Sequence, residues 1–164
     1  MTTVVLGPAE TLSRALADGV GDVIVVDARA TADETMWQTL VVLQTAHSSM
    51  APHGGRIVLI LPTIGMAGAA TLVNYTTAIE GIRSMAKSAA RQWASEGIAV
   101  NIVAAPLGLF RSDVDWSHLT AAAVRNDGGL IHSVVETAKF LLRPDIDHLT
   151  GETVIVDGGS VMLP

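Results

Sequence analysis

The stretch GRIVLIL, residues 55–61, has five apolar residues in an unbroken row after Arg56. A strand covered on only one face alternates apolar and polar residues, so an unbroken row indicates a strand that is buried on both faces. Strands of this kind form the centre of parallel sheets that helices cover from both sides. Further strands are expected in four stretches: TVVLG (3–7), DVIVVDA (22–28), IAVNIVAAP (98–106) and TVIVDGG (153–159).

Segments with helical spacing separate these strands. They are AETLSRALADG (9–19), residues 33–50 with Asp33 or Thr31 as the cap, residues 72–95 ending at Gly97, and SVVETAKFLL (133–142), which Pro144 stops. Strand and helix therefore alternate throughout, which predicts a single three-layer α/β domain over residues 1–164 with a parallel sheet of about five strands. We expect TVVLG to lie next to DVIVVDA, and the strands to follow the order of the chain. The first of them would then form an exposed edge.

Composition restricts the function classes. The chain is 49% hydrophobic and 16% charged, with a mean hydropathy of +0.45, whereas a soluble domain carries about 25% charged residues. This deficit predicts apolar surface that a second chain covers. The net charge of −6 argues against nucleic acid as a partner. The lack of cysteine is compatible with a reducing, cytoplasmic location. Neither a signal peptide nor a membrane span is expected.

Several motifs follow one another in a recognisable order. GGRIVLI precedes a glycine-containing loop, the tyrosine of NY lies ten residues after Gly65, and SAARQWASEGIAVNIVAAP and LTGETVIVDGG come later. Together they resemble the short-chain dehydrogenase/reductase family, especially its 3-ketoacyl-reductase-like members. DVIVVDARA lies where that family has DVLVNNAG. The resemblance implies a Rossmann-like fold and, in complete members, carbonyl reduction with NAD(P).

The cofactor-binding half of the resembled family has no counterpart in this sequence. Family members have a TGxxxGxG turn, in which glycines let backbone N–H groups approach the pyrophosphate; the chain offers only VVLGPAETL. It is also shorter ahead of the NNAG-like strand, by roughly one βαβα portion. Asp27 and Arg29 replace an amide and a glycine that usually line the cofactor. We therefore expect a truncated Rossmann-like fold with no cofactor-binding residues and no cofactor.

The catalytic residues that the resemblance implies are mostly replaced. Pro62 stands where the family has its serine, Tyr75 matches the acid/base tyrosine, and Ile79 replaces the lysine that lowers the pKa of that tyrosine. An unperturbed tyrosine with a pKa near 10 is ionised in only about one molecule in a thousand at pH 7. Thr63 could replace the serine only if the loop shifted. Tyr75 is interpreted as vestigial, with residual catalysis as the alternative.

Other polar residues give weaker signals. The histidines at 47, 53, 118, 132 and 148 lack ligand spacing, so no metal site is expected. His47 beside Ser48 and Ser49 cannot form a nucleophile–base pair, because adjacent residues of a helix do not face each other. Acidic residues in the loop 108–130 cap or solvate it, or contact a substrate: Asp113, Asp115 and Asp127. Gly158 and Gly159 are expected to form a tight turn.

The surviving elements indicate association. In the resembled family, the helices corresponding to 33–50 and 72–95 pack against a neighbouring subunit as a four-helix bundle, and the C-terminal strand takes part in a second interface. Small residues such as Gly81 would let another helix approach. The alternative is that these apolar faces are intramolecular core. The proposed interface residues are Trp37, Leu40, Val41, Gln44, Ile82, Met85, Ala89, Trp93, Val154 and Val156.

The leading hypothesis is a catalytically inactive subunit that associates with an active full-length reductase or dehydrogenase of the same family and supports it in a hetero-oligomer. Self-association is the other possibility for its partner. Two further hypotheses remain open: a minimal NAD(P)-dependent oxidoreductase that uses Tyr75, and a homo-oligomeric module that binds an acyl ligand between Pro62, Tyr75 and the loop 108–130.

Overall fold

Strands and helices alternate along the chain, as the sequence predicts. The computed structural model describes all residues except 8, 27–30, 112, 114–120, 126 and 163–164. Its strands are β1 (Thr2–Leu6), β2 (Val23–Val26), β3 (Gly55–Pro62), β4 (Ile98–Ala105) and β5 (Thr153–Ile155). Its α-helices are α1 (Glu10–Val20), α2 (Ala32–Met50), α3 (Ile64–Ala67), α4 (Val73–Trp93) and α5 (Leu130–Leu141), and the 3-10 turns are η1 (Ala94–Glu96) and η2 (Leu107–Leu109).

The five strands form one sheet in the order β2-β1-β3-β4-β5, and every neighbouring pair is parallel. The parallel sheet is confirmed, but the expected chain order is wrong, because β1 lies between β2 and β3. All five residues of β1 are buried, whereas β2 is only partly covered and Val25 is 48% exposed. On this side of the sheet the edge strand is therefore β2. The chain moves outward from β1 to β2 and then back past β1 to β3. The strand order therefore reverses between β1 and β3, although all the strands are parallel.

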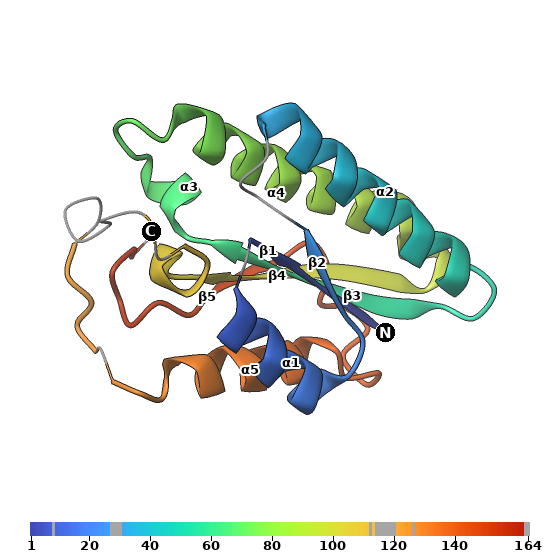
Figure 1. Cartoon of the computed structure of the whole chain (residues 1–164). Helices are drawn as coiled ribbons and strands as arrows, with labels where there is room; N and C mark the ends of the chain where they lie inside the picture. The colour runs from blue at the N-terminus through green and yellow to red at the C-terminus, as the bar shows by residue number, and fades with distance from the viewer. Residues whose placement is uncertain (8, 27–30, 112, 114–120, 126, 163–164) are drawn as a thin grey trace.

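Helices cover both faces of the sheet, which confirms the three layers (Figure 1). The helices α2 and α4 cover one face, where Leu43, Ile79 and Leu59 belong to one apolar core. The helices α1 and α5 cover the other face, where Leu12 and Val134 pack with Val58 in a second core. Because β3 contributes alternate residues to both cores, its unbroken apolar row is explained.

The ends of the helices follow from local sequence. Thr31 caps α2: its hydroxyl accepts a hydrogen bond from the Glu34 N–H, and the Glu34 carboxylate accepts one from the Thr31 N–H. This reciprocal capping box decides between the two expected caps, Thr31 and Asp33. The segment after α4 ends at Gly97, which has φ +72° and so provides the left-handed C-cap that the sequence predicts.

The helices α2 and α4 pack directly against each other. A Cβ placed on Gly81 would lie 2.6 Å from the sulfur of Met36, so this glycine makes room for a side chain of α2 in the same molecule. Further along, the His47 ring stacks on Trp93 with centroids 4.5 Å apart and bonds the Glu96 carboxylate at 2.8 Å. The small-residue face of α4 is thus occupied, at Gly81, by the chain's own α2. None of the helices in the described part of the chain is long and apolar enough to cross a membrane.

Candidate functional site

Tyr75 lies near the start of α4, as the family motif requires, but its side chain is buried. It is 8% exposed and packs in the same core as Ile64 and Leu107. Its hydroxyl has no hydrogen-bond partner among the residues that the structure describes. The Arg111 guanidinium lies 5.2 Å from the ring centroid and is held by an ion pair of 2.6 Å with Asp113. The phenol therefore faces protein, and no donor or acceptor of the described residues orients it.

The surroundings of Tyr75 oppose acid/base chemistry. Burial raises the pKa of the Tyr75 phenol well above its ordinary value, and this effect outweighs the opposing attraction from the Arg111 cation. Asp113 raises the same pKa slightly further. A general acid/base works best with a pKa near the working pH. The Tyr75 phenol therefore keeps its proton throughout the physiological range.

The two replaced catalytic positions offer no substitute. Ile79 lies one helical turn after Tyr75, is fully buried, and belongs to the same core. Pro62 is the last residue of β3 and has neither an N–H nor a polar side chain. Thr63 follows it but is only 2% exposed, and its N–H donates to the Ala105 carbonyl at 2.8 Å. In this structure Thr63 is not accessible to a substrate, and the shifted loop is not seen.

The turn between β1 and α1 lies where the sheet reverses, which is the usual place for a dinucleotide in such folds. Gly7 adopts φ +105°, and a Cβ there would lie 3.2 Å from the Phe110 carbonyl oxygen. The Gly7 N–H donates to Val26 and the Ala9 N–H donates back to Gly7. Phe110 itself is 1% exposed. The Phe110 carbonyl oxygen thus lies beside Gly7, and the described residues of the turn, 7 and 9, have no free N–H to offer a pyrophosphate.

Some candidate residues lie outside the described residues: Asp27, Arg29, Asp115 and His118. Among the residues that are described, no group of three or more His, Cys, Asp or Glu could hold a metal ion. The structure does place Asp127, whose carboxylate accepts from the Gly129 N–H at 2.9 Å and pairs with Arg125 at 2.7 Å. These contacts, the Arg125 bond first, lower the pKa of Asp127. Asp127 thus orders the turn before α5, whose N-cap residue Gly129 provides no side-chain cap.

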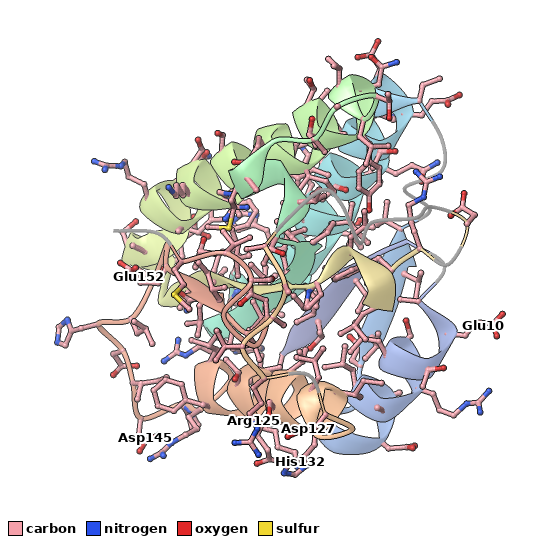
Figure 2. The ribbon with its side chains drawn as sticks, turned by 90° about the vertical axis from the view of Figure 1, so that its left-hand side faces the viewer. Glu10, Arg125, Asp127, His132, Asp145 and Glu152 are labelled. Atoms are coloured by element: carbon pink, nitrogen blue, oxygen red, sulfur yellow. The ribbon has the colours of Figure 1, made fainter. Side chains whose placement is uncertain are left out.

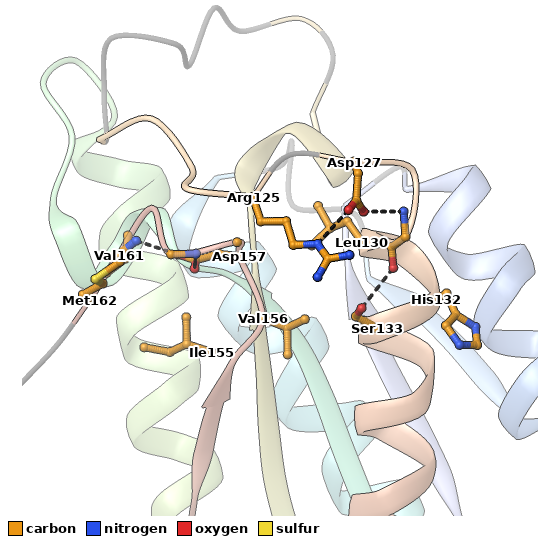
Figure 3. Close-up of a pocket in the computed structure, with 13 residues that line it drawn as sticks. Arg125, Asp127, Leu130, His132, Ser133, Ile155, Val156, Asp157, Val161 and Met162 are labelled. Atoms are coloured by element: carbon orange, nitrogen blue, oxygen red, sulfur yellow. Dashed lines mark hydrogen bonds and ion pairs between the residues drawn. The ribbon is translucent and has the colours of Figure 1, made fainter.

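A cavity of about 690 Å³ lies beside this turn, between the start of α5 and the end of β5 (Figure 3). Its floor is apolar, from Ile155 and Val156, and Arg125, Asp127 and His132 provide charged or polar groups. Figure 2 shows these last three together at one end of α5, well away from Glu10 on α1. This cavity could not be predicted from the sequence, because its residues come from segments about 30 positions apart and share no motif.

The DGG motif has a structural explanation. Asp157 is 4% exposed, and its carboxylate accepts from the Gly159 N–H, the Val161 N–H and the Ser160 hydroxyl. Gly158 and Gly159 have φ +68° and +84°, so the predicted tight turn is confirmed. Gly158 also allows close backbone contact, because Arg125 donates its N–H to the Gly158 carbonyl at 3.0 Å.

A second, more polar cavity of about 730 Å³ lies between α4 and the free edge of β5. Arg83 lines it, nearly buried, and binds the Glu80 carboxylate at 2.9 Å. Lys87 and Glu152 line it as well. The i,i+3 spacing of Glu80 and Arg83 is the one signal in the sequence that indicates this ion pair.

The structure divides the proposed interface residues into two groups. Ile82, Ala89 and Trp93 lie inside the chain's own core, so they cannot contact a partner without rearrangement. On α2, by contrast, Trp37 is 65% and Val41 43% exposed. The remaining positions are exposed or partly exposed on α2, α4 and around β5: Leu40, Gln44, Met85, Val154 and Val156.

Together, the doubly wound parallel sheet and the tyrosine near the start of α4 are features of a Rossmann-like domain. The family model described as enoyl-(acyl carrier protein) reductase matches residues 13–161. The chain therefore belongs to the short-chain dehydrogenase/reductase family.

Similar proteins agree with this assignment. The chain is 34% identical over 121 residues to a 3-oxoacyl-(acyl-carrier-protein) reductase of Vibrio harveyi, which covers 70% of this chain and 49% of that one. It is 32% identical over 129 residues to carbonyl reductase family member 4 of Danio rerio, covering 76% of this chain and 53% of that one. The chain thus spans about half the length of these relatives.

Solved structures support the fold. A gluconate 5-dehydrogenase from Burkholderia cenocepacia, solved with NADP and tartrate, superposes with a TM-score of 0.68 at 17% identity, over 96% of this chain and 94% of that one. An acetoin dehydrogenase from Salmonella typhimurium gives a TM-score of 0.64 at 17% identity, over 98% and 96% of the two chains. At these identities the likeness concerns the fold alone.

Proposed function

We propose that this protein is a non-catalytic member of the short-chain dehydrogenase/reductase family that associates with an active, full-length reductase of the same family and supports it in a hetero-oligomer. The observation that carries the proposal is the burial of Tyr75 and Ile79 in one core. At this depth the phenol is shielded from a substrate, and no described residue bonds its hydroxyl. The family's chemistry also needs a cofactor beside it, and the Phe110 backbone lies against the turn where one would bind.

The outer face of α2 supports an association role. Trp37 and Val41 are one helical turn apart, and both are substantially exposed to solvent. Between Thr35 and Met50 the sequence has no Asp, Glu, Lys or Arg. The acidic residues of α2, Asp33 and Glu34, lie in its first turn, and an exposed tryptophan is typical of the centre of an interface. We refer to Trp37, Leu40, Val41 and Gln44 as the outer α2 face.

A homologous partner is favoured because this chain has the elements that would contact it, namely the helices α2 and α4 and the strand β5. The relatives that the chain matches are reductases, and a homologue offers an equivalent helix with an equivalent face. Related subunits can pack such helices across a pseudo-two-fold axis, as identical subunits do across a true one. In this arrangement the partner supplies catalysis, and this chain stabilises the assembly from outside the active site.

Co-expression with a full-length short-chain reductase encoded next to this protein tests the proposal. We expect the two chains to co-purify, and Trp37→Arg to weaken the complex by at least about 30-fold, because a central tryptophan contributes about 2 kcal/mol or more. Phe140→Arg is the matched control, since Phe140 is similarly apolar, 45% exposed and on α5, which covers the opposite face of the sheet. If the chains never co-purify, or if both variants weaken the complex equally, the proposal fails.

A further inference from the structure

The two edges of the sheet differ in how they are protected. Beside the free edge of β5 lies the polar cavity with Glu80, Arg83 and Lys87. Charged side chains of this kind keep an edge strand from pairing with another chain. The strand β2 consists of four apolar residues, Val-Ile-Val-Val, and has neither a charge nor a proline. Its exposed Val25 makes it the less protected edge in the described part of the chain.

The backbone of β2 has a defined set of free groups. The Thr3 N–H donates to the Asp22 carbonyl at 3.0 Å, and the Gly7 N–H donates to the Val26 carbonyl at 2.7 Å. Residues 22 and 26 therefore point their backbone groups toward β1, and so does residue 24 by alternation. Val23 and Val25 consequently direct their N–H and C=O groups away from the sheet. The free edge offers two donors and two acceptors.

We propose that β2 is the interface of a homodimer, in which the β2 strands of two copies pair antiparallel and join the two sheets into one. With the two-fold axis at Ile24, Val23 of each copy lies opposite Val25 of the other. In an antiparallel pair, such opposite residues exchange both of their hydrogen bonds. All the donors and acceptors at the free edge are then satisfied, and no charged residue of the strand is buried. This self-complementarity identifies a second copy as the occupant.

The flanking helices permit this approach. Met36 and His47 mark the side of α2 that faces α4. At 100° per residue, the side of α2 toward the β2 edge carries residues 38, 42, 45 and 49, which are Gln, Val, Thr and Ser. On α1, Gly19 packs against Val135 of α5, so residues 13, 17 and 20, which are Ser, Ala and Val, lie on the edge side. Helices of two copies could therefore pack side by side over each face without like-charge repulsion.

Light scattering during size exclusion tests the dimer. We expect a mass of twice the 17.1 kDa of one chain for the wild type, and the mass of a single chain for Val25→Lys, which places a charge at the pairing edge. Phe140→Lys is the control, because Phe140 is exposed to a similar extent (45% against 48%), and it should remain a dimer. Val25→Pro is a second variant: it removes an outward N–H while leaving the bonds to β1 intact.

Amide exchange adds a measurement that needs no variant. The Val23 and Val25 amides should exchange more slowly as the wild-type concentration rises, whereas amides of α5 should not change. The proposal is overturned if the wild type is monomeric at about 100 μM, a concentration far above the Kd of a stable dimer, or if folded Val25→Lys stays dimeric. It is also overturned if Trp37→Arg, but not Val25→Lys, breaks the dimer. Because the outer α2 face is not needed for this pairing, failure to bind a reductase would leave the homodimer unaffected.

Discussion

At the scale of single residues, Tyr75 shows that a side chain's chemistry depends on its surroundings. Its position in the sequence matches an acid/base tyrosine, but the structure gives it a buried hydroxyl and a fully buried isoleucine one turn later. The ring takes part in packing and in the contact with Arg111. The hydroxyl, in contrast, contributes no described hydrogen bond, so the ring and the hydroxyl can be tested separately.

Tyr75→Phe should raise the free energy of unfolding by about 1 kcal/mol, because it removes an unpaired polar group from the interior. Tyr75→Ala should lower it by about 3–5 kcal/mol, because it leaves a cavity in the core. Urea denaturation of both variants measures the difference. If Tyr75→Phe instead costs about 1 kcal/mol or more, the hydroxyl makes a hydrogen bond in solution, and its interpretation as vestigial must be revised.

The burial of Tyr75 also predicts how stability depends on pH. Because burial raises the folded-state pKa of Tyr75 above the unfolded value of 10.0, the folded chain retains a proton that the unfolded chain loses. The stabilisation is complete below pH 10 and declines as the pH rises further.

Tyr75 is the chain's only tyrosine, so tyrosinate absorbance reports on it alone. We expect the absorbance to appear together with unfolding, and the alkaline loss of stability to be smaller in Tyr75→Phe. Tyrosinate formed near pH 10 in folded protein would contradict the burial.

At the scale of elements, the segment after β5 depends on one carboxylate. Asp157→Ala should lower the free energy of unfolding by about 3 kcal/mol, because two backbone N–H groups and the Ser160 hydroxyl lose their acceptor near the protein interior. Asp157→Asn should cost less, since one amide oxygen remains. Asp145→Ala serves as the control, because its partner Arg143 is exposed, and it should leave the urea midpoint nearly unchanged. Equal effects of Asp157→Ala and Asp145→Ala would refute the anchoring role.

Elements whose causes are local could be predicted from the sequence. Thr31 and Glu34 provide a capping box within four residues, and Gly97 ends its helical segment through its own φ. The position of β1 could not be predicted, because β1 and β2 are both apolar. Their order depends on the direction in which the connections through α1 and α2 carry the chain across the sheet. The place of Phe110 over Gly7 joins residues about a hundred positions apart, and no local pattern encodes it.

At the scale of the whole molecule, the chain has two separate uncharged surfaces. The outer α2 face points away from the sheet, whereas the β2 edge lies at the side of the sheet. Of the expected interface residues, Trp37 and Val41 on α2 are exposed, whereas Ile82 and Trp93 on α4 are core. Helical spacing alone could not separate these cases, because a helix that packs against both a sheet and another helix has apolar residues around most of its circumference.

The proposed function makes a last prediction about the whole chain on its own, namely that it does not bind NAD(P). A ligand with a Kd of 10 μM, present at about 1 mM, would raise the free energy of unfolding by about 2.7 kcal/mol. We expect the urea midpoint of the purified chain to stay unchanged with NADPH or NADH at this concentration. The reason is that the Phe110 carbonyl oxygen lies close to Gly7. Because this oxygen is a backbone atom, a change of side-chain rotamer cannot move it away. A full-length reductase treated in the same way is the positive control.

A shift in this chain that Tyr75→Phe leaves intact would establish a cofactor site without catalysis. A shift accompanied by turnover that Tyr75→Phe abolishes would establish an enzyme and refute the non-catalytic role.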